Sequence, residues 1–163
     1  MILIALGANL PSNGLQPIET LQRALAGLAE RGVAVAAVSS FYETPAWPDP
    51  ADPAFVNAVA AVETPLQPVE LLALLHGVET EFGRMRSAPN APRTLDIDLI
   101  DYEGRQVQGD LILPHPRAGE RAFVLVPLAD IAPGWRHPVT GQGVAGLLAA
   151  LPAADRAQVK KLA

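Results

Sequence analysis

The spacing of the apolar residues changes period several times along this chain, and this order of periods limits the possible folds. Two segments, residues 16–28 and 68–82, repeat apolar side chains at helical spacing. Four segments have the alternating or β-branched pattern of strands: residues 2–6, 33–42, 54–64 and 95–102. The order strand, helix, strand, strand, helix, strand predicts an α+β fold in which helices pack on a largely antiparallel sheet, and its simplest form is the ferredoxin-like sandwich.

The later part of the chain has weaker patterns. Val107 and residues 111–113 suggest two further short strands. Residues 120–131 and 143–151 look helical, although Pro127 is expected to break or bend the first of these helices. Between the second and third strand segments, several prolines predict a stiff, irregular loop.

Length and composition restrict the class of protein. The 163 residues fit one domain spanning 1–163, and the sequence leaves open whether 152–163 form a loose C-terminal tail. Half of the residues are apolar and 18% are charged, which is typical of a folded chain. The absence of cysteine excludes disulfides and thiolate metal sites.

Charge and hydropathy also limit the partners. A net charge of −5 argues against non-specific binding to nucleic acid or to an anionic membrane. The sequence has no apolar run of bilayer length, and no basic segment precedes the first apolar residues. We therefore expect a cytoplasmic protein without nucleic acid or membrane partners, and a monomer is the default although the sequence does not fix the oligomeric state.

Asp96 and Asp98 are the first candidates for chemistry. They are two residues apart in a predicted strand, so their carboxylates leave the same face of the sheet while Leu95, Ile97 and Leu99 point to the other. Mg²⁺ prefers one or two carboxylates, with water and substrate phosphate completing its coordination. A short acid pair of this kind is more often a solvated face, so the flanking residues decide the interpretation.

The flanks are rich in arginine, which suits the bidentate binding of phosphate oxygens. Six of the chain's arginines fall close to the acid pair in sequence: Arg84, Arg86, Arg93, Arg105, Arg117 and Arg121. His115 lies between two prolines in the same region and could donate to a phosphate oxygen. The alternative, that these cations only neutralise nearby surface acids, stays open at this point.

Upstream segments offer groups for a flat heterocycle. Asn57 has an amide that both donates and accepts, which matches the edge of a ring such as a pterin, and Phe55 and Phe123 could stack on its faces. Core packing is the stronger interpretation for each of these two rings alone. No P-loop, dinucleotide-binding glycine pattern or nucleophile elbow is present, so side chains must hold any nucleotide.

Six ordered segments together resemble 6-hydroxymethyl-7,8-dihydropterin pyrophosphokinase of folate biosynthesis. They are residues 5–10, 39–45, 55–57, 79–86, 91–99 and 113–123. The resemblance implies an α+β enzyme that transfers the β,γ-diphosphate of ATP to the hydroxymethyl group of 6-hydroxymethyl-7,8-dihydropterin, with AMP as the other product.

The resemblance also implies roles for individual residues. Asp96 and Asp98 would hold two Mg²⁺ ions, and with Arg84 and Arg93 they would form the catalytic set. ATP would meet Glu79, Arg84, Arg93, Leu99, His115 and Arg121. The pterin would meet Thr44, Pro45, Ala46, Trp47, Phe55, Asn57, Asp96 and Phe123.

The chain also departs from the family pattern in places. The loop 87–91 is shorter than in some members, and Phe55 replaces a common tyrosine. We expect the loops 44–53 and 83–92 to close over bound substrates.

Two other interpretations remain: a Mg²⁺-dependent nucleotide hydrolase on the same scaffold, and a non-catalytic ferredoxin-like binding module.

Overall fold

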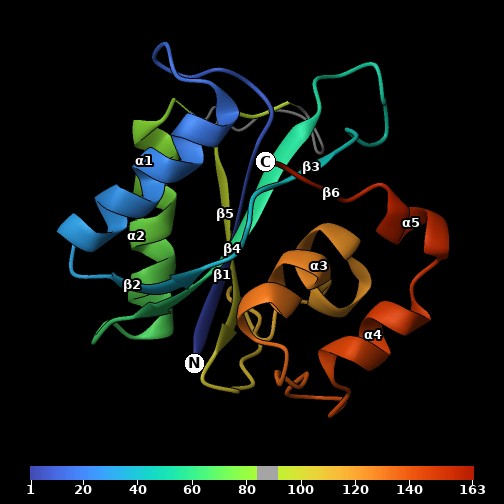
Figure 1. Ribbon diagram of the computed structural model, residues 1–163. Coiled ribbons are helices and arrows are strands. Elements are labelled where there is room, and N and C mark those ends of the chain that lie inside the picture. Colours follow the sequence, from blue (N-terminus) through green and yellow to red (C-terminus); the bar gives the residue numbers. More distant parts are fainter. Residues whose placement is uncertain (84–91) are drawn as a thin grey trace.

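One antiparallel sheet forms the centre of the molecule (Figure 1). The computed structural model describes residues 1–83 and 92–163. The sheet order is β5-β1-β4-β3-β6, with β2 also paired to β4, and each of these pairings is antiparallel. The strands are β1 (Ile2–Ala8), β2 (Ala34–Val38), β3 (Tyr42–Thr44), β4 (Phe55–Glu63), β5 (Asp96–Tyr102) and β6 (Lys160–Lys161).

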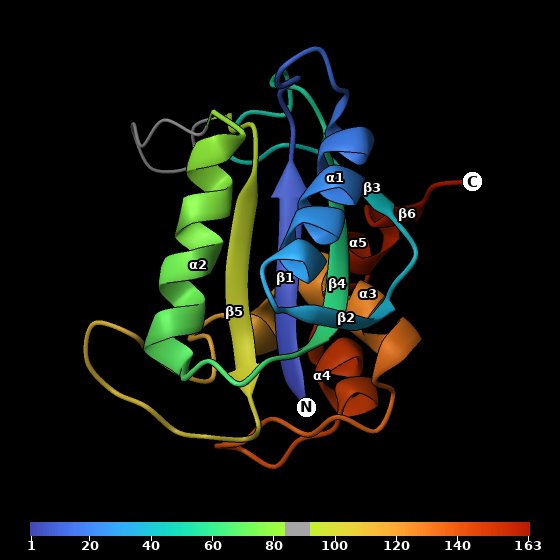
Figure 2. The same cartoon turned by 90° about the vertical axis from the view of Figure 1, so that its left-hand side faces the viewer.

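Helices cover both faces of this sheet. Figure 2 shows α1 and α2 side by side on one face, with α3 and α4 behind it. The helices are α1 (Pro17–Glu30), α2 (Pro68–Glu81), α3 (Ala122–Ile131), α4 (Val144–Ala150) and α5 (Ala153–Ala157), with a short 3₁₀ turn at Ala118–Glu120. The α+β, ferredoxin-like fold expected from the order of periods is confirmed.

The alternation of side chains along β1 and β4 sends apolar groups to both faces. Ile4, Leu6 and Val62 pack with Leu21 and Leu75 of the α1 and α2 layer. On the opposite face a second apolar cluster joins the sheet to α3 and α4: Leu3, Val59, Ala61, Ile100, Val124, Leu125, Leu128 and Leu147. Two cores therefore share one sheet, and the side chains that neither core uses are available for a site.

The two helices of the first layer start in the same way. Each begins with proline, whose fixed φ suits the first turn. The Gln16 N–H donates to Glu19 Oε2 at 2.8 Å, and the Gln67 N–H donates to Glu70 Oε2 at 2.7 Å. These local contacts fix where both helices begin.

Two local predictions are wrong. Val107 and Leu113 form only an isolated bridge, so the two short strands expected there do not exist. Pro127 lies inside α3 and does not end it. Proline removes one backbone donor, but Leu125 and Leu128 on either side are fully buried against the sheet, and this packing keeps the helix continuous.

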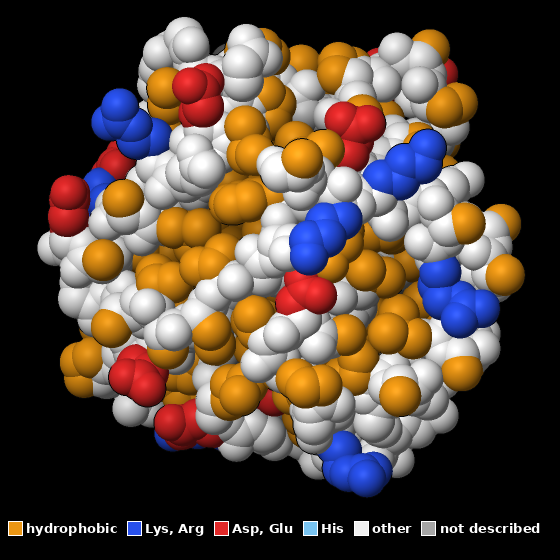
Figure 3. All heavy atoms as spheres, in the orientation of Figure 1, with side chains coloured by type: hydrophobic (Ala, Val, Ile, Leu, Met, Phe, Trp, Pro, Cys, Tyr) orange, Lys and Arg blue, Asp and Glu red, His pale blue; other side chains and the backbone are white. Residues whose placement is uncertain are grey.

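The C-terminal residues belong to the same fold. After α5, Lys160 and Lys161 pair with Glu43 and Tyr42, which adds β6 to the edge of the sheet. On the face drawn in Figure 3, basic side chains are interspersed with acidic ones among many apolar groups. None of the helices in the described ranges is long and apolar enough to span a membrane.

Candidate active site

Helix α3 covers only part of its side of the sheet. Leu3, Val59 and Ile100 lie under the helix, but further along β1 the small residues Ala5 and Gly7 leave space above the strand. A pocket of about 380 Å³ opens there, bounded by the start of α3 and by the segment after β3. Ten of the predicted site residues line it: Thr44, Pro45, Trp47, Phe55, Asn57, Arg93, Asp96, Asp98, Arg121 and Phe123.

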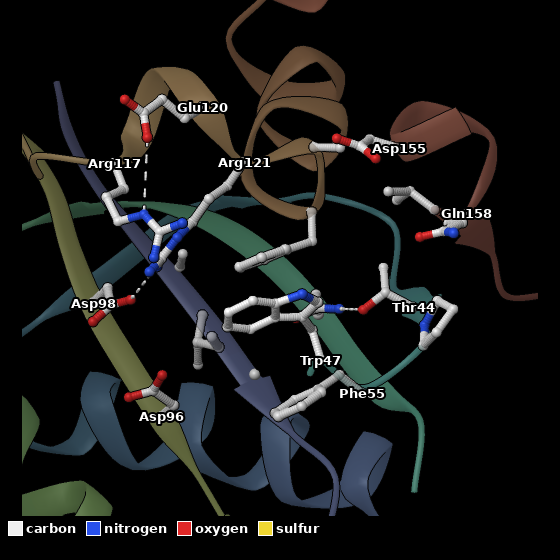
Figure 4. A pocket seen from close by; sticks show the side chains of 18 of the residues that line it. Thr44, Trp47, Phe55, Asp96, Asp98, Arg117, Glu120, Arg121, Asp155 and Gln158 are labelled. Atoms are coloured by element: carbon white, nitrogen blue, oxygen red, sulfur yellow. Dashed lines mark hydrogen bonds and ion pairs between the residues drawn. The ribbon is translucent and has the colours of Figure 1, made fainter. Parts of the chain in front are cut away.

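The two acids lie on the pocket side of β5, as the two-residue period predicts. Leu95, Ile97 and Leu99 are buried in the opposite core. Each carboxylate has an arginine neighbour: Arg93 Nη1 lies 2.9 Å from Asp96 Oδ2, and Arg121 Nη1 lies 3.7 Å from Asp98 Oδ2. The cations therefore neutralise the acid pair from two sides, as Figure 4 shows for Arg121.

Each of these arginines also lies over a phenylalanine. The guanidinium carbon of Arg93 is 5.7 Å from the ring centre of Phe55, and that of Arg121 is 5.5 Å from the ring centre of Phe123. Both contacts are in the range of cation–π attraction. The pocket thus combines a charged end and an aromatic end that share their side chains.

Arg93 is positioned by a buried asparagine at the end of β1. The Arg93 N–H donates to Asn9 Oδ1 at 2.8 Å, and the Asn9 N–H donates to the Arg93 carbonyl at 3.1 Å. The Asn9 Nδ2 donates to the Pro53 carbonyl at 3.0 Å, next to β4. One side chain therefore joins three loops at the pocket, a role that the sequence analysis missed.

His115 lies beside the acid pair and outside the pocket lining. Its Nδ1 accepts a hydrogen bond from the Arg117 N–H at 3.1 Å, and its Nε2 faces Asp98 Oδ2 at 3.9 Å. Burial lowers the pKa of His115, and the nearby Arg121 guanidinium lowers this pKa further. His115 therefore favours the neutral form, with Nε2 directed toward the acids.

Arg121 is surrounded by charge of both signs. Burial lowers its pKa, the Asp98 carboxylate opposes this shift, and the Arg117 cation adds to it. Arg117 itself is exposed and pairs with Glu120 at 3.8 Å. Several cations therefore meet at this end of the pocket, which favours an anionic ligand such as a polyphosphate.

The other end of the pocket is built on two strands. The Asn57 Nδ2 donates to Thr44 Oγ1 at 2.8 Å, and both residues are buried. A Cβ at position 7 would lie 3.1 Å from the Asn57 Oδ1. Glycine at this position therefore leaves room for the Asn57 amide. This end presents an oriented amide beside Phe55, a suitable surface for the edge of a flat heterocycle.

Four of the residues assigned by resemblance do not line the pocket. Ala46 is buried next to it, and His115 lies behind Asp98. Leu99 is buried in the core on the opposite face, and Glu79 is buried on α2, where it accepts from the Ile97 N–H at 3.4 Å. Arg84 lies outside the described residues.

The structure also brings into the pocket residues that were not among the site residues assigned from the sequence. Arg117 and Glu120 come from the turn before α3, and three others come from the C-terminal residues: Asp155, Gln158 and Val159. The approach of the three C-terminal residues to the pocket depends on the pairing of β6 with β3, which joins residues far apart in sequence. No local pattern carries that information.

The donor set fits magnesium. In the described ranges no group of three or more acidic, histidine or cysteine side chains could hold a metal ion. Two carboxylates on one strand face are nevertheless a typical protein contribution to Mg²⁺ when substrate phosphates supply further ligands. Asp96 and Asp98 would hold such ions at the cationic end of the pocket.

The chain is similar to known proteins over most of its length. The model of the family described as 7,8-dihydro-6-hydroxymethylpterin-pyrophosphokinase (HPPK) matches residues 3–133. A 2-amino-4-hydroxy-6-hydroxymethyldihydropteridine pyrophosphokinase of Pseudomonas aeruginosa is 40% identical over 154 residues, which are 93% of this chain and 91% of that protein. One of the same description from Synechocystis sp. is 43% identical over 133 residues, 80% of this chain and 68% of that protein.

Solved structures share the fold. A crystal structure of HPPK-DHPS in complex with substrates has a TM-score of 0.69 at 12% identity and covers 91% of this chain. The wild-type HPPK-DHPS of Plasmodium falciparum also gives 0.69, at 14% identity and 90% coverage. This chain spans only 42% and 40% of those two longer chains. At such identities the likeness shows the fold alone, whereas the family match and the bacterial relatives show that the chain belongs to the 7,8-dihydro-6-hydroxymethylpterin-pyrophosphokinase family.

Proposed function

We propose that this protein transfers the β,γ-diphosphate of ATP to the hydroxymethyl group of 6-hydroxymethyl-7,8-dihydropterin and releases AMP, as a step in folate biosynthesis. Membership of the family supports this reaction. The observation that carries it is the composition of one pocket: paired acids with arginine partners at one end, and Asn57 with two phenylalanines at the other.

The charged end would receive the nucleotide. Asp96 and Asp98 would hold two Mg²⁺ ions, which when bound neutralise phosphate charge and polarise the reacting phosphorus. Arg93 and Arg121 already lie beside these carboxylates and can turn to phosphate oxygens as the triphosphate enters. His115, neutral with Nε2 toward Asp98, would donate to a phosphate oxygen.

The aromatic end would receive the pterin. Phe55 and Phe123 would stack on the ring faces, while Asn57, Thr44 and the backbone from Pro45 to Trp47 would bind its edge. With the ring edge held there, its hydroxymethyl group would lie toward Asp96 and the nucleotide. The chain then acts mainly by holding the hydroxyl oxygen and the β-phosphorus in line and by stabilising charge.

Three further roles rest on the resemblance. We propose that Arg84 meets the phosphates, that Glu79 helps to hold the nucleoside, and that the backbone near Leu99 contributes to the nucleotide site. Glu79 is buried on α2 and accepts a hydrogen bond from the Ile97 N–H of β5. It would therefore influence the nucleotide site through the backbone of that strand.

The reaction is tested by its products. The protein is incubated with ATP, Mg²⁺ and 6-hydroxymethyl-7,8-dihydropterin, and nucleotides and pterins are separated by chromatography. We expect AMP and pterin diphosphate to form in equal amounts, with no ATP consumed when the pterin is omitted. Formation of ADP, or equal ATP consumption without the pterin, would contradict the proposal.

A further inference from the structure

The pocket has a wall that lies outside the part of the chain matched by the family model. That match ends at residue 133, yet Asp155, Gln158 and Val159 line the pocket. We call residues 153–162 the C-terminal segment. It comprises α5, β6 and the residues that join and follow them.

The C-terminal segment is held in place by the sheet. Lys160 pairs with Glu43, Lys161 pairs with Tyr42, and the Leu162 N–H donates to the Phe41 carbonyl at 2.9 Å. The side chain of Leu162 packs against the core on the α1 and α2 face. These contacts fix the segment along β3, the strand that carries Thr44.

The register of this pairing places the segment at one particular end of the pocket. Strand β6 begins shortly after Gln158, the residue that ends α5, and Gln158 and Val159 line the pocket together with Thr44 and Pro45. A second hollow behind this wall is also lined by Thr44, Pro45 and Gln158, which places these three residues together independently. Gln158 is therefore a neighbour of the residues proposed to bind the ring edge.

Figure 4 shows Asp155 and Gln158 on the side of Thr44, across the pocket from Asp96 and Asp98. Asp155 is an acceptor when ionised, and Gln158 offers both an acceptor and donors. At this end the Asn57 Nδ2 already donates to Thr44. The wall therefore adds acceptors beside the Asn57 amide, one N–H of which already donates to Thr44.

An aminopyrimidinone ring edge has the complementary chemistry, because its amino group and adjacent ring nitrogen carry N–H donors. We propose that Asp155 and Gln158 are specificity-determining residues that accept hydrogen bonds from the two N–H bonds of the amino group. This inference rests on the proposed function. It assigns part of the selection for the pterin ring to the C-terminal segment, which lies beyond the range matched by the family model. The proposed binding of the nucleotide at the charged end of the pocket does not change.

The test compares two stable ring probes in three variants. The probes are 6-hydroxymethylpterin and 6-hydroxymethyllumazine, in which an oxygen replaces the 2-amino group. The variants are Asp155→Ala, Gln158→Ala and the matched control Arg156→Ala, which removes an exposed side chain of α5 that does not line the pocket. Affinities are measured by titration calorimetry with Mg²⁺ and a non-hydrolysable ATP analogue present.

We expect wild type and Arg156→Ala to prefer the pterin over the lumazine. Asp155→Ala and Gln158→Ala should each weaken pterin binding about threefold to tenfold, the range of one hydrogen bond near solvent, and should leave lumazine and nucleotide affinity unchanged. Thermal unfolding should match wild type, because both side chains are exposed.

Three results would overturn the inference, and they are distinguishable. If wild type binds the pterin and both variants retain its preference over the lumazine, the C-terminal segment does not select the ring. If wild type binds neither ring probe, both this inference and the proposed function are wrong. Equal losses for both probes would show that the segment acts on pocket shape and would also contradict the proposed hydrogen bonds.

Discussion

The side-chain amide of Asn57 on β4 donates a 2.8 Å hydrogen bond to the Thr44 hydroxyl oxygen on the neighbouring strand β3. In this arrangement Nδ2 points to Thr44 and Oδ1 points away from it. The Asn57 Oδ1 then lies over Gly7 at the floor of the pocket. Two adjacent strands thus prepare an acceptor at the position where we propose that the pterin edge binds.

Replacing Thr44 by valine should disturb this arrangement. The Asn57 Nδ2 would lose its buried acceptor, so we expect a loss of about 1–3 kcal/mol in the free energy of unfolding. Pterin affinity should fall about tenfold, measured by calorimetry with the nucleotide analogue present. The control Thr140→Val lies in an exposed turn outside the pocket lining, where its hydroxyl accepts only the Gln142 N–H at 3.3 Å, so pterin affinity should stay at the wild-type value. Wild-type pterin affinity in Thr44→Val would contradict the assignment of this end.

Gly7→Ala tests the floor of the pocket. The new methyl group would stand 3.1 Å from Asn57 Oδ1, closer than ordinary van der Waals contact, so the amide must move. We expect at least a tenfold loss of pterin affinity. Gly146→Ala in α4, where a Cβ meets no atom within 4 Å, is the matched control and should stabilise the protein by about 0.5–1 kcal/mol.

Asn9 allows its two hydrogen bonds to be separated. Asn9→Asp keeps the oxygen that accepts the Arg93 N–H but loses the donor to Pro53, whereas Asn9→Leu loses both. We expect kcat to fall more in Asn9→Leu than in Asn9→Asp, because Arg93 is positioned through the retained oxygen. Equal kcat values in the two variants, with both proteins folded by circular dichroism, would contradict this role for Asn9.

The buried hydroxyl of Tyr42 predicts a pH dependence of stability. Burial and the hydrogen bond to Asp130 raise its pKa from 10.0 to about 12. The folded state therefore binds this proton more tightly than the unfolded state, so the contribution is complete below pH 10 and is lost as the pH rises toward 12. Denaturant unfolding at several pH values measures it.

In that experiment Tyr42→Phe should be less stable than wild type by about 1–2 kcal/mol at pH 8. The difference between the two proteins should shrink between pH 10 and 12, because the bond from Tyr42 to Asp130, 2.8 Å long, exists only in the protonated form. A constant difference over that range would contradict the assignment.

The sequence predicted those parts of the molecule that local periods determine. Strand alternation placed Asp96 and Asp98 on one face and Leu95, Ile97 and Leu99 on the other, as observed. Helices α1 and α2 followed from their apolar spacing. The break expected at Pro127 was wrong because buried leucines outweigh the missing donor.

Contacts between distant segments could not be predicted in this way. The approach of Arg121 to Asp98 depends on where the turn before α3 meets β5. The entry of Asp155 and Gln158 into the pocket depends on the pairing of β6 with β3. Asn9 was assigned no role from the sequence, because its two partners, Arg93 and Pro53, come from separate parts of the chain.

The central claim is that Asp96 and Asp98 together make this acidic protein a receptor for a metal-bound nucleotide. The most direct measurement is a titration of Mn²⁺, a paramagnetic substitute for Mg²⁺, followed by electron paramagnetic resonance with a non-hydrolysable ATP analogue and 6-hydroxymethylpterin present. We predict two bound Mn²⁺ ions per chain in wild type, and a loss of this binding together with a large loss of nucleotide affinity in Asp96→Asn and Asp98→Asn, while both variants stay folded. Unchanged Mn²⁺ binding and nucleotide affinity in both variants would contradict the account.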